Sequence, residues 1–277
     1  MIGYRNLALV GLLALAATLT PTTAAWSEAE CDGFCWDQDE IDGHFSGVDF
    51  VRVPGRPDPR DYLYSYSCYI ENEVRTADGC VDGVIPPPSE ACEFGVWIEP
   101  RWSRLRDRGD GDPGPWVLEV GYSCPGDEEF PFGFEEFTSL PIEVPTLTVQ
   151  PNTGWVYAGL ETVAYTNGDA QGFVVAVRGL DFYVVATPVE YSWSFGDGSP
   201  SLTSTDPGAP WPDHTVSHTY AAAGRFRPSL TTTWRGDFRQ AEDRQWYQVE
   251  GSGQTTTQGP LIQVHTARTR LVEDDLS

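Results

Sequence analysis

Lysine is absent from this chain of 277 residues, and all 17 of its basic residues are Arg. The absence excludes the Lys-based isopeptide crosslinks that stiffen some surface adhesins, and it is typical of high-GC bacteria such as actinobacteria. Long apolar runs are also absent. The longest, residues 7–19, is shorter than the roughly 20 residues that a membrane-spanning helix needs. We therefore expect no integral membrane anchor.

The N-terminus has the features of a secretory signal peptide. Arg5 supplies a small positive region, residues 7–19 form the apolar region, and residues 21–25 provide the small residues of a cleavage site. We predict a signal peptide over residues 1–25, with cleavage after Ala25, and an uncleaved N-terminal anchor is the alternative. The predicted location is extracellular, either secreted or associated with the cell surface.

The charge of the chain is strongly negative and unevenly spread. The formal net charge is −24, and 27 of the 41 acidic residues lie in residues 26–143 together with 8 of the 17 Arg. Such a field opposes binding to nucleic acid and to anionic membranes. Neither is therefore an expected partner, and a solvated acidic surface is the simplest interpretation of the charge.

Cysteine is confined to the first half of the chain, where all six residues lie between Cys31 and Cys124. An even number of cysteines behind an export signal indicates three disulfide bonds. Six cysteines allow many pairings, and a preference for closing short loops favours one of them. The predicted bonds are Cys31–Cys35, Cys80–Cys92 and Cys68–Cys124.

A crowded run of carboxylates is the candidate cation site. Asp37, Asp39 and Asp42 are hard oxygen ligands at close spacing, which suits Ca²⁺. Ile41 stands where an EF-hand loop requires an oxygen ligand, so the run does not match that loop. A solvated acidic loop is the alternative, and we expect no other cofactor.

Helical periodicity is lacking beyond the signal peptide. The 22 Pro and 28 Gly divide the chain into short runs rich in Val, Tyr, Trp and Thr, which indicates an all-β protein. We predict an acidic, cysteine-rich β domain over residues 26–124, a linker over 125–145, a β-sandwich over 146–272 and an acidic tail over 273–277. An extended strand that packs on one domain is the alternative for residues 125–145.

The strand pattern is clearest in residues 189–195, where polar and aromatic residues alternate. A strand there places Val189, Tyr191, Trp193 and Phe195 on one face. Residues 94–98 and 116–122 are predicted to form a hairpin with a long tip. Further predicted strands are residues 50–53 and 61–68 in the first region, and 161–165, 173–177, 182–187, 225–234, 244–250 and 261–265 in the second.

Two short segments in the second region form a recognisable set. Residues 193–198 read Trp-Ser-Phe-Gly-Asp-Gly, and residues 218–220 read His-Thr-Tyr, with Gly224 close behind. The set resembles the PKD family, the immunoglobulin-like modules of secreted and cell-surface proteins, over roughly residues 146–250. The chain departs from the family pattern at Ser194, where an acidic residue is usual, and in the inserted loop 200–216.

The resemblance implies structural roles for these residues. It makes Trp193 a core anchor beside Phe195, and it makes Gly196 and Gly198 turn residues with positive φ. Asp197 is the carboxylate that accepts hydrogen bonds from turn N–H groups, and His218 belongs to the His-Thr-Tyr turn. Tyr220 is the tyrosine whose hydroxyl bonds to nearby backbone, and Gly224 is the glycine of the following turn.

Enzyme signatures are missing: the sequence contains no Gly-x-Ser-x-Gly, no His-Glu-x-x-His and no Walker loop. We expect a non-catalytic protein that binds a protein or a cell-envelope glycan, or that serves structural assembly. A polysaccharide-active enzyme with a hidden carboxylate pair, or its accessory binding factor, is one alternative. A subunit of an extracellular filament, formed by self-association, is the other.

Trp211 and a group of arginines are the candidate binding residues. We expect Trp211, which lies between two prolines, to pack over the end of the sandwich, and contact with a sugar or protein is the alternative. Arg225 and Arg227 begin a predicted basic stripe that could dock on an acidic domain. Its other members are Arg235, Arg239 and Arg244.

Overall fold

The computed structural model describes residues 45, 47–71, 73–75, 79–93, 96–109, 111–125, 127 and 130–267. The predicted signal peptide, the Cys31–Cys35 bond, the calcium candidates Asp37, Asp39 and Asp42, and the acidic tail lie outside these residues. The regular structure is almost entirely β, which confirms the predicted class. The elements are β1 (Phe50–Val53), β2 (Arg60–Tyr64), β3 (Tyr69–Ile70), β4 (Glu73–Val74), β5 (Arg101–Leu105), β6 (Val117–Val120), α2 (Phe134–Thr138), β7 (Thr148–Gln150), β8 (Trp155–Tyr157), β9 (Glu161–Tyr165), β10 (Gln171–Val177), β11 (Leu180–Ser194), β12 (Leu202–Ser204), β13 (Ser217–Thr219), β14 (Gly224–Phe226), β15 (Ser229–Gln240), β16 (Tyr247–Gln248), β17 (Gly253–Gln258) and β18 (Ile262–His265).

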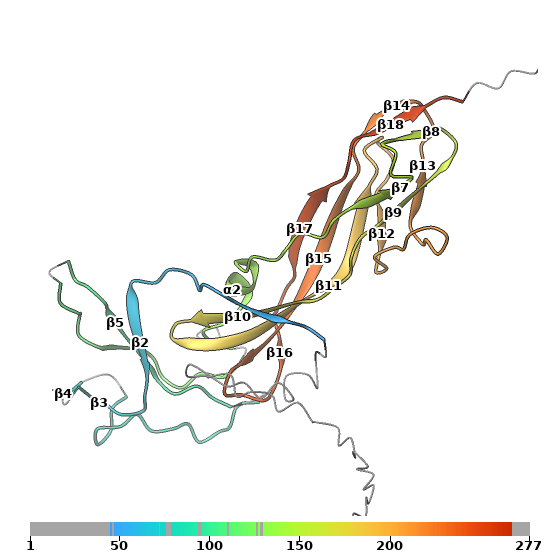
Figure 1. Cartoon of the computed structure of the whole chain (residues 1–277). Helices are drawn as coiled ribbons and strands as arrows, with labels where there is room; N and C mark the ends of the chain where they lie inside the picture. The colour runs from blue at the N-terminus through green and yellow to red at the C-terminus, as the bar shows by residue number, and fades with distance from the viewer. Residues whose placement is uncertain are drawn as a thin grey trace, which may run out of the picture. The chain divides into compact units, whose positions relative to one another are not determined.

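The largest sheet is built around two long strands, β11 and β15, which lie side by side along their length (Figure 1). Its order is β1-β10-β11-β15-β16, with β12 paired to β11 and β17 paired to β15. Two smaller sheets, β13-β9-β7 and β14-β18-β8, complete the sandwich. Within the described residues, no helix is long and apolar enough to cross a membrane.

A β-bulge in β11 keeps two cores on one face of the largest sheet. Its register with β15 shifts between Pro188 and Glu190, which leaves Val189 without a cross-strand partner. The extra residue changes which side chains face inward. Before the bulge the even-numbered residues Phe182, Val184 and Ala186 enter one core, and after it the odd-numbered residues Tyr191, Trp193 and Phe195 enter another. Val189, predicted to share the face of Trp193, is outside both cores.

The core that contains Trp193, which we call the first core, fills the sandwich. It contains the aromatic residues that the alternating pattern predicted on one face, together with aliphatic residues from the two smaller sheets. Its buried members are Leu147, Val149, Val156, Ala164, Tyr191, Trp193, Phe195, Val216, Tyr220, Leu230, Ile262 and Val264.

The core that contains Phe182, which we call the second core, lies against β10, the part of β11 before the bulge and the part of β15 that pairs with it. Residues 130–140 cover this core. Phe130, Phe132, Phe137 and Leu140 are buried here against Phe182 and Phe238. This segment, predicted as a linker, is therefore packed on the sheet, as in the alternative interpretation. The segment contains the helix α2 where the alternative interpretation expected an extended strand. Its phenylalanines reach the sheet partly from this short helix and partly from the residues that precede the helix.

The large sheet also takes a strand from the first region of the chain. Strand β1 pairs in parallel with β10, from Phe50 opposite Gly172 to Val53 opposite Val175. The two terminal nitrogens of Arg52 donate to the Asp181 carboxylate over 3.1 and 2.9 Å. The predicted boundary at residue 145 thus falls inside a set of contacts that joins residues on both sides of it.

The cysteine-containing part has its own small sheet, β2-β5-β6. Strand β5 pairs with both neighbours, and its Trp102 is buried beside Cys68. The predicted hairpin of residues 94–98 with 116–122 is wrong, because β5 takes the place of the first strand. Among the described residues of that predicted strand, 96–98, Ile98 forms an isolated bridge with Ser123.

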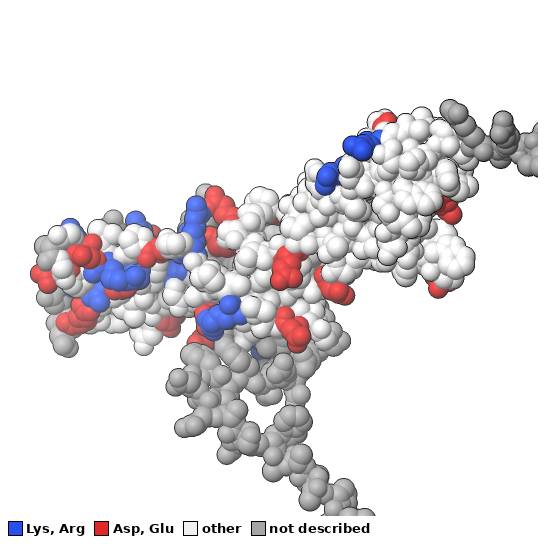
Figure 2. All heavy atoms as spheres, turned by 45° about the horizontal axis from the view of Figure 1, so that its top comes forward, with Lys and Arg blue, Asp and Glu red and all other residues white. Residues whose placement is uncertain are grey.

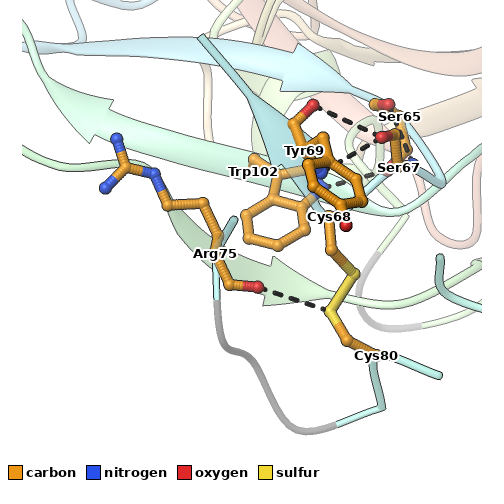
Figure 3. The surroundings of a disulfide bond; sticks show 7 residues. All are labelled: Ser65, Ser67, Cys68, Tyr69, Arg75, Cys80 and Trp102. Atoms are coloured by element: carbon orange, nitrogen blue, oxygen red, sulfur yellow. Dashed lines mark hydrogen bonds between the residues drawn. A yellow bond between two sulfur atoms is a disulfide. The ribbon is translucent and has the colours of Figure 1, made fainter. Parts of the chain in front are cut away.

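The disulfide bonds are Cys68–Cys80 and Cys92–Cys124, so the predicted pairings Cys80–Cys92 and Cys68–Cys124 are wrong. The chain folds back after Cys80, and the Cys68 N–H donates to the Gly83 carbonyl over 2.9 Å, which brings the two cysteines together. Figure 3 shows the Cys68–Cys80 bond and its surroundings. The bridge at Ser123 likewise brings Cys124 beside the segment that follows Cys92. Loop length alone carries no information on these backbone pairings.

Candidate functional site

The Gly-Asp-Gly turn after β11 is held together by Asp197. Its carboxylate accepts hydrogen bonds from the Ser199 N–H over 3.1 Å and from the Ser199 hydroxyl over 2.6 Å. Nε2 of His218 lies 2.8 Å from the same carboxylate. Gly196 has a φ of 78°, and a Cβ there would lie 2.5 Å from the Arg227 carbonyl oxygen. This turn therefore requires glycine for both its conformation and its close approach to backbone.

Stacked rings extend the turn into the sandwich core. The His218 ring stacks on Phe195 with centroids 4.2 Å apart and meets the edge of Tyr220 at 4.7 Å. The Tyr220 hydroxyl donates to the Phe195 carbonyl over 3.2 Å. Gly224 begins β14 with a φ outside the left-handed region, and a Cβ there would meet the Phe226 ring at 2.6 Å. These contacts are internal, and they indicate a structural role for the set.

The turn has a consequence for the acid stability of the protein. Burial by itself raises the pKa of Asp197, but the hydrogen bonds from Ser199 and His218 outweigh burial and lower it to about 2. A carboxyl whose pKa is depressed in the folded state stabilises that state when the pH is above the ordinary pKa of the group, which is 3.8 for Asp197. That stabilisation is lost as the pH falls from 3.8 toward about 2.

We expect Asp197→Asn to lower the free energy of unfolding at neutral pH by about 1.5–3 kcal/mol, the usual value for a hydrogen bond to a charged group. The variant should also lose less stability than the wild type on acidification, because it lacks the titrating group. Urea unfolding at neutral and acidic pH measures both effects. Asp213→Asn, in an exposed position of the inserted loop, is the control and should follow the wild type. Unchanged stability of the Asp197 variant at neutral pH would contradict the role given to this carboxylate.

Glu119 of β6 is a carboxylate of the cysteine-containing part that accepts several hydrogen bonds. It accepts hydrogen bonds from Arg60, from Nε of Arg101 over 3.1 Å and from the Ser103 hydroxyl over 2.7 Å. Burial raises the pKa of Glu119, but the bonds from Ser103 and Arg101 lower it below its usual range. An ionised carboxylate between two guanidinium groups is an anchor for the sheet β2-β5-β6. Within the described part of the chain, no three His, Cys, Asp or Glu side chains are arranged to hold a metal ion.

Trp211 does not pack over the end of the sandwich. Its side chain is 69% exposed, while its backbone N–H donates to the Gln150 side chain over 2.8 Å. The expected packing is therefore wrong, because the inserted loop is fixed through its backbone and leaves the ring in solvent.

The predicted arginine stripe is not a continuous surface. Arg225 is exposed and donates to Gln263, whereas Arg227 points a terminal nitrogen at the Gly259 carbonyl over 3.4 Å. Arg239 is buried, with its guanidinium 5.0 Å from the centre of the Tyr183 ring. Arg235 and Arg239 share one face of β15, but Arg235 pairs with Asp237 over 3.1 Å and is partly exposed, whereas Arg239 is buried.

The outer face of the sheet β14-β18-β8 carries an exposed group of side chains, which we call the aromatic face. Trp155 is 43% exposed and Tyr157 is 38% exposed, and their rings meet at right angles with centroids 5.3 Å apart. His265 lies 5.9 Å from Trp155, also edge to face. The face is completed by Gln263 and Arg225, joined by a hydrogen bond of 2.8 Å from the Arg225 Nε.

Strand register explains how these five side chains meet. Gln263 of β18 stands between Trp155 of β8 and Arg225 of β14, and His265 stands opposite Tyr157. The residues between them, such as Val156 and Val264, point the other way and are buried in the first core. Of the five, only Arg225 was predicted from the sequence as a binding residue. The signal for the others was the alternation of polar or aromatic residues with aliphatic ones in two runs of three and four residues.

The fold and the turn chemistry define an immunoglobulin-like β-sandwich built on a Gly-Asp-Gly turn. Residues 147–233 match the PKD domain family, and this part of the chain is a PKD domain. Human polycystin-1 is 37% identical over 102 residues, which cover 35% of this chain and 2% of polycystin-1. The chain thus spans a small part of that relative's length. Strand β18, which supplies Gln263 and His265, lies beyond the matched range.

Proposed function

We propose that this protein is a secreted or surface-associated interaction protein without catalytic activity, which binds its partner through the aromatic face of the PKD domain. PKD domains are typically modules for extracellular interactions with proteins or carbohydrates. The disulfide bonds suit an oxidising compartment outside the cell.

One observation carries the proposal: the outer face of a short, well-packed sheet presents Trp155 and Tyr157 to solvent. Trp, Tyr and Arg are the residues that most often dominate binding energy at contact surfaces. Lys, Glu, Asp, Ser and Ala are depleted in such surfaces, and strands β8, β14 and β18 contain none of these five residue types. The composition of the face therefore fits a binding surface better than an ordinary solvated one.

The test is capture of a partner from the cell envelope of the producing organism by the purified mature chain. The double substitution Trp155→Ala and Tyr157→Ala should reduce capture by about tenfold or more, because such anchors are each worth more than 1 kcal/mol. Tyr66→Ala removes an aromatic side chain that is 51% exposed in the cysteine-containing part and is the matched control. Equal capture by the double variant would contradict the assignment of the face. Turnover of a glycan or peptide by the wild type, abolished by substitution of a carboxylate, would contradict the absence of catalysis.

A further inference from the structure

We propose that the ligand of the aromatic face is a polysaccharide that bears carboxylate groups. The inference rests on the proposed binding function and goes further, because it names the class of ligand and gives each side chain a part in holding it. Trp155 and Tyr157 provide the apolar surface for sugar rings, and Arg225 provides the partner for a carboxylate.

The arrangement of the face has the dimensions of a short saccharide. Trp155, Gln263 and Arg225 form one row across three neighbouring strands. Adjacent strands lie about 4.8 Å apart, so the row spans about 10 Å, the length of about two sugar rings. Tyr157 and His265 form a second row beside it. A ligand that lies along the first row meets an aromatic ring at one end and a guanidinium group at the other.

The size of the face argues against a globular protein as the ligand. A protein–protein interface of standard size involves roughly 20–30 residues on each side. The aromatic face consists of five side chains on strands of three or four residues. Aromatic rings of this kind offer an apolar surface with limited loss of side-chain entropy, which suits the C–H faces of a sugar.

The charge of the face favours an anionic ligand. Arg225 donates to Gln263 through Nε, which leaves the terminal nitrogens of its guanidinium to pair with a carboxylate in the two-pronged geometry typical of Arg. No Asp or Glu lies in β8, β14 or β18, although the chain carries a net charge of −24. The visible surface of the sandwich is mostly uncharged in Figure 2, and the charged residues gather mainly on the cysteine-containing part. An acidic ligand therefore avoids repulsion at this face.

The experiment measures binding of the mature chain to polygalacturonate, alginate and hyaluronan by calorimetry. Fully methyl-esterified polygalacturonate, which has the same sugar without the charge, is the matched ligand. We expect at least one of the three acidic polysaccharides to bind, with about tenfold weaker binding for Trp155→Ala. Arg225→Gln should weaken binding of the acidic form by about tenfold and leave binding of an esterified form unchanged. Tyr66→Ala, at an aromatic residue that is 51% exposed in the cysteine-containing part, is the control, and thermal unfolding verifies that each variant is folded.

Each remaining result has a defined meaning. The inferred ligand class is overturned if the protein binds none of the three acidic polysaccharides. It is also overturned if polygalacturonate and its methyl ester bind equally. The proposed function survives that failure if the wild type still captures an envelope component that the Trp155 and Tyr157 double variant does not. A captured protein with the same dependence on Trp155 would replace the polysaccharide as the ligand and overturn the inference.

Discussion

Replacing Trp193 with Ala is expected to lower the free energy of unfolding by about 3–5 kcal/mol, the range for removal of a large aromatic side chain from a packed core. Trp193 is 1% exposed and stands opposite Leu230 of β15 and Leu202 of β12. Its ring packs in the first core together with Tyr191, so deletion leaves a cavity that rigid β-strands cannot close. Chemical denaturation of the mature protein, followed by fluorescence and circular dichroism, measures the loss.

Two further substitutions separate volume from other effects. The indole N–H of Trp193 finds no hydrogen-bond partner among the described residues. Trp193→Phe should therefore be much milder than Trp193→Ala, since it retains most of the ring and removes a buried unsatisfied donor. Trp211→Ala removes an exposed Trp and should change the stability by less than about 0.5 kcal/mol. Similar losses for Trp193→Ala and Trp211→Ala would contradict the assignment of Trp193 to the core.

The PKD fold was predictable because its signal is local in the sequence. The Gly-Asp-Gly turn and the His-Thr-Tyr segment lie about twenty residues apart, and each residue type has a physical reason at its position. Their contacts, such as His218 with Asp197 and Tyr220 with the Phe195 carbonyl, join the two segments across 21 and 25 residues, but the residue types within each short segment identify it. Local chemistry of this kind can be interpreted without knowing how distant strands pair.

The features that could not be predicted depend on which segments of the chain pair with one another. The aromatic face joins Trp155 of β8 to Gln263 of β18, which are neighbours only because the two strands pair in parallel. The disulfide bond of Cys68 with Cys80 depends on where the chain folds back, and not on the number of residues in the loop. A hydrophobic pattern determines which face a residue occupies, but it leaves the partner strand and the register open.

The bulge in β11 illustrates the same limit. Alternation in residues 189–195 identified the inward face of that segment, and Tyr191 and Trp193 are both buried. The extra residue at Val189 reverses the alternation for the rest of the strand, so Phe182 and Val184 share the sheet face of Trp193 despite their even numbers. One face of the sheet therefore supports two cores, and the second needs a cover that the sandwich itself does not supply.

Phe137→Ala tests whether residues 125–145 are that cover. Phe137 is fully buried in the second core, and its ring lies so close to Gly236 that a Cβ there would approach it to 2.7 Å. We expect a loss of about 3–5 kcal/mol in the free energy of unfolding, measured by urea denaturation. Phe134→Ala, in the same short helix but at a position that is 48% exposed, is the matched control and should have a much smaller effect. A flexible linker would tolerate both substitutions equally. A large loss for Phe137 alone would instead make residues 125–145 part of the folded unit, joined to the PKD domain through β10, β11 and β15.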